Sequence, residues 1–314
     1  MSKGHTMTWT FTRRGLVLGL LGGSMEGMAL GNSSSITRLQ SNGLTFPTFL
    51  RGPKRGRPIL LLHGFPQEPS TWDSMSQDLA ENSYYMVAPF QRGYAATARP
   101  NGLDGYTFTQ FVGDVLGIAD DLHLDKFDVV GFGIGGVQAW MLAAYHPTRI
   151  RSLTSIRYPH PAAFARAMQS DPEQRDKWTR VQRELGAGNP AAKAGAMLAD
   201  NAAGLRTFLM SHGLPEPFLS RYISRLKEPG ALEGALSWNQ AISLDEFSKV
   251  PPVTAPTLLV WSEGPALARV AADASRDYVN APFTEVTVPG SSHFLLETSS
   301  TAMIGPLRKH LAAT

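Results

Sequence analysis

The fold of this chain is indicated first by one glycine-rich stretch, Val130-Gly131-Phe132-Gly133-Ile134-Gly135-Gly136. It follows the apolar run 127–130, whose length and composition are typical of a strand buried on both faces. Closely spaced glycines after a buried strand indicate a sharp turn, because glycine adopts backbone conformations and close approaches that other residues do not. The pattern therefore predicts a tight turn from a strand into a helix.

The segments around this turn alternate between strand and helix patterns. Continuous apolar runs at 58–62 and 84–88 predict two further buried strands, and helical stretches are expected at 72–81 and 109–122. Alternation of this kind favours a mostly parallel sheet with helices on both faces. The fold class expected from the residues is therefore α/β.

A long helical block interrupts the α/β pattern. After the strand expected at 150–156, residues 161–247 read as helical throughout, and strand patterns resume at 256–261 and 283–288. We expect residues 32–160 and 248–314 to form the α/β core and residues 161–247 to form a cap. Open α/β sheets bind ligands at the carboxyl ends of their strands, so the cap is expected to cover that edge.

Composition excludes several kinds of chemistry. The chain has 314 residues, of which 43% are hydrophobic and 18% charged, as in a globular protein with a sizeable core. It contains no cysteine, which rules out disulfides and thiolate sites. The sequence has no HExxH or other metal-ligand cluster, so we expect neither a metal nor another cofactor. The small net charge of +3 and the lack of a basic stripe disfavour nucleic acid as a partner.

Residues 1–31 have the pattern of an export signal. The pair Arg13-Arg14 precedes the apolar stretch 16–23, and the small-residue site Ala29-Leu30-Gly31 follows. The paired arginines resemble a twin-arginine signal, which exports folded proteins. We expect an exported protein, periplasmic or extracellular, whose mature chain begins near Asn32. The alternative is an N-terminal arm or a short membrane-associated helix on a cytoplasmic protein.

Five segments together resemble one family, the capped epoxide hydrolases and haloalkane dehalogenases of the α/β-hydrolase superfamily. They occur in the family's order and cover the chain from about residue 36 to its end. The segments are Leu61-Leu62-His63-Gly64-Phe65-Pro66-Gln67, Gln91-Arg92-Gly93-Tyr94, the glycine-rich turn 130–136, Tyr158-Pro159-His160-Pro161-Ala162-Ala163-Phe164 and Gly290-Ser291-Ser292-His293-Phe294. The resemblance implies an α/β-hydrolase fold with a helical cap insertion.

The resemblance also implies what stands at the catalytic positions. The nucleophile position at the centre of the turn is occupied by Gly133, which has no atom that can attack carbon. Its neighbour Phe132 stands where relatives usually carry histidine. The backbone N–H groups of Phe65 and Ile134 are expected to form an oxyanion hole. The family histidine corresponds to His293, which can take or give a proton near neutral pH.

Other positions depart from the family pattern as well. The loop expected to present an aspartate carries Glu263, which is either the acid that orients His293 or a surface carboxylate. The cap positions of two tyrosines that donate hydrogen bonds to an epoxide appear as Thr179 and Asn239. Phe90 stands where the family has an aspartate.

The other histidines and the tryptophans of the cap are expected to have structural roles. We expect His63 to hold its turn by hydrogen bonding and His160 to be a rigid hinge residue of the cap, whereas His212 is expected at the surface. The aromatic residues of the cap, Trp178 and Trp238, are expected to belong to the core and the pocket lining.

Three functions remain open from the sequence. The first is an enzyme that uses His293 for proton transfer, as an isomerase, lyase, cyclase or hydrolase that activates water directly. The second is a non-catalytic receptor or carrier that binds a small apolar organic molecule. The third is an interaction scaffold whose cap surface binds another protein.

Overall fold

The computed structural model describes residues 35–100, 102–186, 188–290 and 292–314. The segment 1–31, for which an export signal is expected, lies outside the described residues. Within the described parts of the chain, no helix combines the length and the apolar character needed to cross a membrane.

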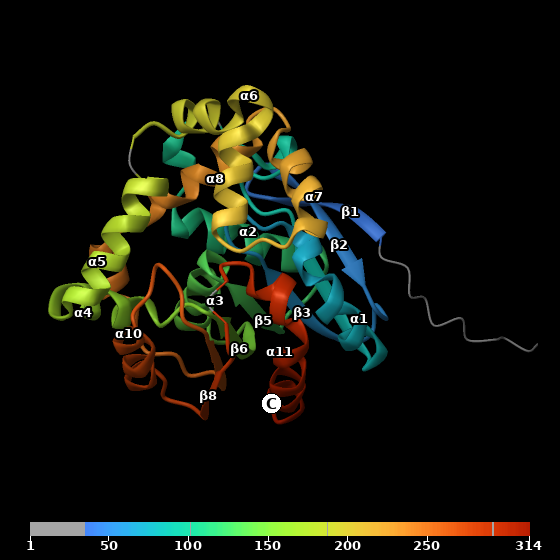
Figure 1. Cartoon of the computed structure of the whole chain (residues 1–314). Helices are drawn as coiled ribbons and strands as arrows, with labels where there is room; N and C mark the ends of the chain where they lie inside the picture. The colour runs from blue at the N-terminus through green and yellow to red at the C-terminus, as the bar shows by residue number, and fades with distance from the viewer. Residues whose placement is uncertain (1–34, 101, 187, 291) are drawn as a thin grey trace, which may run out of the picture. The chain divides into compact units, whose positions relative to one another are not determined.

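The core is one eight-stranded sheet (Figure 1). Its strands are β1 (Ser35–Ser41), β2 (Leu44–Arg51), β3 (Arg57–Leu62), β4 (Tyr84–Pro89), β5 (Phe127–Phe132), β6 (Ile150–Ile156), β7 (Thr257–Trp261) and β8 (Phe283–Thr287). Their order across the sheet is β1-β2-β4-β3-β5-β6-β7-β8. The strands β1 and β2 run antiparallel to their neighbours, and all other pairs are parallel. The expected α/β class is confirmed.

Helices cover both faces of the sheet. The longer core helices are α1 (Asp73–Glu81), α2 (Phe108–Asp121), α3 (Ile134–Tyr145) and α11 (Leu295–Ala312), with the short helix α10 (Arg269–Asp273). The apolar sides of α1 and α11 share one hydrophobic cluster, and those of α2 and α3 share another. Figure 1 shows α1 and α11 as neighbours. Strand β5 is buried along its whole length, because helices cover it on both sides.

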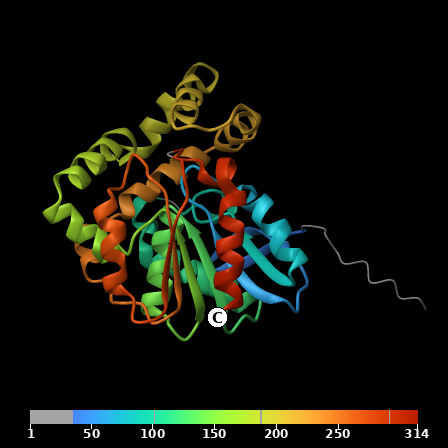
Figure 2. The ribbon, with the colours of Figure 1, turned by 60° about the horizontal axis from the view of Figure 1, so that its bottom comes forward.

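A set of helices is inserted between β6 and β7. They are α4 (Pro161–Ser170), α5 (Pro172–Val181), α6 (Pro190–Ser211), α7 (Glu216–Leu226), α8 (Ala231–Ser237) and α9 (Leu244–Ser248). The short helical turns of the chain are η1 (Pro69–Trp72), η2 (Ala96–Ala98), η3 (Leu103–Gly105), η4 (Gln182–Gly186), η5 (Trp238–Ala241) and η6 (Ala274–Tyr278). In Figure 2 the yellow-green and yellow helices of this insert lie together beyond one end of the sheet. We call this insert, α4 to α9, the cap.

Contacts beyond β4 show that the cap lies at the carboxyl ends of the strands. Gly93, in the turn after β4, approaches α8 so closely that a Cβ on it would lie 2.7 Å from the carbonyl oxygen of Gly234. The guanidinium of Arg225 in α7 lies 4.2 Å from the ring centroid of Phe90, a cation–π contact between cap and core. Phe90 thus packs against the cap and is 2% exposed.

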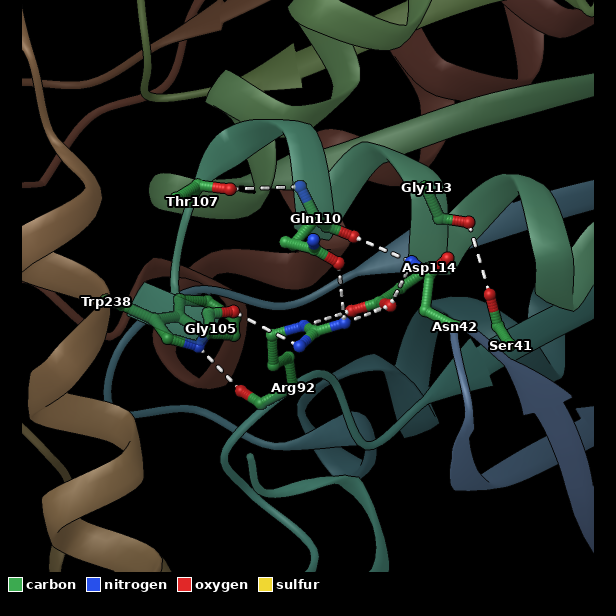
Figure 3. Close-up of polar contacts among 9 residues, drawn as sticks. All are labelled: Ser41, Asn42, Arg92, Gly105, Thr107, Gln110, Gly113, Asp114 and Trp238. Atoms are coloured by element: carbon green, nitrogen blue, oxygen red, sulfur yellow. Dashed lines mark hydrogen bonds and ion pairs between the residues drawn. The ribbon is translucent and has the colours of Figure 1, made fainter. Parts of the chain in front are cut away.

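A buried ion pair anchors the turn that receives the cap (Figure 3). Arg92 forms two parallel hydrogen bonds with Asp114 of α2, from Nε to Oδ2 over 2.7 Å and from Nη2 to Oδ1 over 2.6 Å. Asn42 adds a third bond to the carboxylate over 2.8 Å. The indole N–H of Trp238 donates to the carbonyl oxygen of Arg92 over 2.6 Å. The ion pair therefore fixes the backbone atom that holds the cap tryptophan.

Removal of Asp114 should destabilise the protein strongly. The variant Asp114→Ala leaves the buried guanidinium of Arg92 without its counter-charge, and such losses cost about 3–5 kcal/mol. The matched control is Asp120→Ala, because Asp120 pairs with Arg149 but its side chain is 64% exposed; exposed pairs contribute at most about 1 kcal/mol. Urea unfolding of both variants measures the two free energies. Equal losses would show that the buried pair does not anchor the core.

Candidate functional site

The turn between β5 and α3 holds Gly133 with φ 56° and ψ −122°, a conformation that residues with side chains rarely adopt. A Cβ on Gly131 would lie 2.1 Å from the carbonyl oxygen of Gly135, and one on Gly135 would lie 2.3 Å from that of Leu62. These flanking positions therefore require glycine. At Gly133 the nearest atom to a Cβ would be the Cα of Gly64, 3.8 Å away. Space for a side chain exists at this one position of the turn.

A pocket lies over Gly133, between the sheet and the cap. Its cavity volume is about 100 Å³. The core contributes Phe65 and Phe132, and the cap contributes Trp178 and Asn239. Most of its lining is apolar, as in many sites for small organic molecules. These four residues and Gly133 were all expected at the site from the sequence, and the structure brings them to one pocket.

Two backbone amides, those of Phe65 and Ile134, belong to residues that line this pocket. Ile134 is the first residue of α3, so its N–H has no acceptor within the helix. The N–H of Phe65 likewise has no backbone partner among the described residues. Free amides at a helix N-terminus favour negative charge. The arrangement can stabilise an oxyanion or a ligand carbonyl.

His293 lies in the pocket wall, with its ring 6.3 Å from that of Phe132. Its Nε2 lies 2.5 Å from the carbonyl oxygen of Phe65. A carbonyl oxygen only accepts hydrogen bonds, so Nε2 donates and carries the proton of the neutral ring. Burial, together with the positive charge of Arg157, lowers the pKa of His293 to about 3. The imidazole is therefore neutral over the physiological range.

No carboxylate orients His293 among the described residues. The side chain of Glu263 is exposed, and neither a hydrogen bond nor an ion pair connects it to His293. The backbone of Glu263 does contact the site, because its carbonyl oxygen accepts a hydrogen bond from Arg157 over 2.7 Å. The structure thus places Glu263 as a surface carboxylate, one of the two alternatives left by the sequence.

Arg157 occupies the space beside His293, and the sequence analysis missed it. It follows β6 directly, adopts φ 72°, and is only 6% exposed. Its Nη1 donates to the carbonyl oxygen of Ser292 over 2.5 Å. Burial lowers the pKa of Arg157 to about 10, so the guanidinium stays charged at neutral pH. The available signal was an arginine directly after an expected strand, next to the start of the cap.

Three residues that were expected in or near the pocket, Trp238, His63 and Thr179, do not line it in the structure. Trp238 is fully buried against His63, with stacked rings 5.6 Å apart, and neither residue lines the pocket. Thr179 is exposed, so it is not a donor toward the pocket. Helical phase explains this difference, because adjacent residues of α5 point in different directions. Trp178 faces inward and Thr179 faces solvent.

His63 holds its turn. Its Nε2 accepts the backbone N–H of Gln91 over 3.3 Å, so its Nδ1 donates to the carbonyl oxygen of Gly64 over 3.0 Å. Burial lowers its pKa to about 3. These hydrogen bonds engage both ring nitrogens of His63, so neither nitrogen is available for proton transfer to a ligand.

His160 and His212 also hold backbone segments. The side chain of His160 caps α4 through a bond from the N–H of Ala162, which agrees with its expected place at the start of the cap. His212 was expected at the surface. Its carbonyl oxygen instead accepts the N–H of His293 over 3.0 Å, which joins the cap to the His293 loop.

His293 should not titrate in the physiological range. NMR of the imidazole protons, assigned with His293→Gln, should show no change of its charge between about pH 7.5 and about pH 5, although an ordinary histidine titrates there. Because its pKa is lowered on folding, protonation favours the unfolded chain. The stability that the neutral ring contributes is present above pH 6.5 and is lost as pH falls toward 3. A measured pKa near 6.5 would contradict this description.

The described residues contain no cluster of three or more histidine, cysteine, aspartate or glutamate side chains that could hold a metal. The site consists of two backbone amides, a neutral imidazole, a buried guanidinium, the polar side chains of Asn239 and Tyr158, and an otherwise apolar wall. It can bind a polar group at its floor and can stabilise negative charge there. The side-chain nucleophiles serine, cysteine and aspartate do not occur among the residues that line it.

Comparisons with known proteins agree with this architecture. A family model described as alpha/beta hydrolase fold matches residues 57–300. Epoxide hydrolase 4 of Homo sapiens is 30% identical over 275 residues, which cover 82% of this chain and 73% of that protein. Epoxide hydrolase A of Mycobacterium tuberculosis is 24% identical over 302 residues, which cover 82% of this chain and 91% of that protein.

Solved structures show the same fold. A structure described under novel epoxide hydrolases in metagenomes from hot environments has a TM-score of 0.78 and 25% identity, and covers 90% of this chain and 100% of its own. Bacillus megaterium epoxide hydrolase in complex with an inhibitor has a TM-score of 0.77 at 20% identity, over 88% of this chain and 100% of its own. The chain is thus an epoxide-hydrolase-like member of the alpha/beta hydrolase fold family.

Proposed function

We propose that this chain binds a small organic molecule with an apolar body in the pocket over Gly133 and does not hydrolyse it through a covalent intermediate. The observation that carries the proposal is the open space at Gly133. The flanking glycines are required by backbone contacts as short as 2.1 Å, whereas Gly133 leaves 3.8 Å of clearance and has no side chain. The turn that would expose a nucleophile is therefore present, but the attacking atom is missing.

The state of His293 supports binding over catalysis. A general base works best when its pKa lies near the working pH, and the pKa of this ring is lowered to about 3. Its Nε2 proton is held by the carbonyl oxygen of Phe65. In the described structure no carboxylate stabilises the imidazolium that proton transfer would create.

A second candidate function is proton transfer without a nucleophile, as in an isomerase or lyase. One observation favours it, since His293 lines the same pocket as the residues whose amides are free, Phe65 and Ile134. If Nδ1 accepted a proton from carbon, these amides would stabilise the developing oxyanion. This chemistry requires a bound ligand to raise the pKa of His293.

Binding without turnover is the expected outcome for the native protein. Calorimetry should detect 4-phenylbutanamide in the pocket, while styrene oxide incubated with the protein yields no diol above background. The variant Ala266→Trp fills the pocket wall and should abolish binding, whereas Ala192→Trp, at an exposed position of α6, should not. His293→Gln should retain binding. Conversion of styrene oxide to an isomer such as an aldehyde, abolished in His293→Gln, would establish the second candidate, and diol release would contradict the proposal.

Placing a carboxylate at position 133 should not restore hydrolysis. In Gly133→Asp the carboxylate oxygen can attack an epoxide carbon, so that a C–O ester bond forms, the ring C–O bond breaks and water protonates the alkoxide. The ester then persists, because His293 lacks an acid and general acid–base assistance contributes about 10²–10⁴-fold. Intact mass should show one added styrene oxide and no sustained diol release. Gly133→Asn, whose amide oxygen is a far weaker nucleophile than a carboxylate, should show no addition on the same time scale; multiple turnovers by Gly133→Asp would contradict the proposal.

A further inference from the structure

The pocket over Gly133 contains one charge and no counter-charge. Among the residues that line it, Arg157 and His293 are the basic groups, and none is aspartate or glutamate. His293 is neutral, so the guanidinium of Arg157 is the charge that remains. Among the described residues no carboxylate lies within 4 Å of it, since Arg157 takes part in none of the ion pairs.

A buried cation without an anion is unfavourable, because burial removes its hydration and supplies no opposite charge. We propose that the ligand of this pocket is an organic acid with an apolar body, and that Arg157 binds its carboxylate. The inference rests on the proposed role of the pocket as a small-molecule site, and it adds the chemical class of the ligand. The anion that Arg157 lacks within the protein is then supplied by the ligand.

Two hydrogen bonds hold the guanidinium of Arg157 in place and leave its other N–H groups available. Two backbone carbonyl oxygens, those of Ser292 and Glu263, accept one bond each from Nη1 and Nη2. A guanidinium has five N–H groups, so about three have no partner among the described residues. Gly264 leaves room for the group, since a Cβ there would lie 1.6 Å from Nη2 of Arg157. A fixed planar donor of this kind suits a carboxylate.

The position of Arg157 places this donor beside the floor of the pocket. Gly133 directly follows β5 and Arg157 directly follows β6, and these strands are parallel neighbours. The N–H of Gly133 donates to the carbonyl oxygen of Ile156, the residue before Arg157, over 3.0 Å. A carboxylate bound to Arg157 therefore lies next to the open space over Gly133, and an apolar body can extend along the aromatic wall.

A carboxylate fits this site better than a phosphate. The pocket offers one positive side chain, and a phosphate dianion would leave one negative charge buried without compensation. The lining is mostly apolar, which suits a hydrocarbon or aryl body rather than a sugar. The ligand class is therefore a monocarboxylate with an aryl or alkyl chain.

The test compares acids with their neutral amides on the native protein. Three matched pairs serve as probes: butanoate, 4-phenylbutanoate and 1-naphthylacetate, each with its amide, measured by calorimetry at pH 7. We expect at least one acid to bind about tenfold more tightly than its amide, the order of a charge-assisted hydrogen bond. Acid and amide of equal affinity would overturn the inference and leave the proposed function intact. Failure of all six probes to bind would overturn both.

Variants of Arg157 test whether this side chain causes the preference for the acid over the amide. Arg157→Gln should remove the preference for the acid, and Arg157→Lys should restore part of the preference because it keeps the charge. The control Arg166→Gln removes an arginine that is 54% exposed and should change nothing. A preference for the acid that survives in Arg157→Gln would place the carboxylate elsewhere and overturn the inference.

A titration of the native protein gives a test that needs no variant. The charge of Arg157 lowers the pKa of His293, so a carboxylate bound to Arg157 must raise that pKa, and a bound amide must not. NMR of the His293 ring with saturating 4-phenylbutanoate or its amide measures both values. An unchanged pKa of His293 in the acid complex would show that the carboxylate does not bind beside Arg157.

Discussion

The close approach of α3 to the end of β3 is the constraint on which the site depends. The backbone of Gly135 lies so near Leu62 that a Cβ would fall 2.3 Å from its carbonyl oxygen. This contact fixes the start of the helix, and so the direction of the Ile134 amide and the position of Gly133. The same backbone frame can hold a reactive side chain, or leave space for a ligand.

The cap is attached to this frame through backbone atoms as well as through side-chain pairs such as Tyr222 and Glu297. Trp238 donates to the carbonyl oxygen of Arg92, and Gly93 and Gly234 touch through their main chains. The loop of His293 is likewise bound to the cap through the carbonyl oxygen of His212. Side chains facing the pocket can therefore change while the cap keeps its place.

The fold could be predicted from the sequence, but the site only in part. Glycine spacing and apolar runs are local signals, and they predicted the turn and the sheet, whereas Phe65, Ile134 and His293 were expected from the resemblance to a known family. The orientation of single side chains is not local. Thr179 faces solvent because of its helical phase, and the carboxylate of Glu263 leaves the pocket although its carbonyl remains. Arg157 belongs to no motif, so only tertiary structure shows that it is buried.

The contact between Gly264 and Arg157 makes two distant positions interdependent. Any side chain at position 264 would occupy the space of the guanidinium, because even a Cβ would lie 1.6 Å from Nη2. A change at position 264 therefore requires the guanidinium of Arg157 to move, or Arg157 to be replaced by a smaller residue. Substitutions at positions 157 and 264 are therefore coupled, and a library that varies the 262–267 loop should keep Gly264 or vary Arg157 as well. Redesign of this pocket must begin at the end of β6.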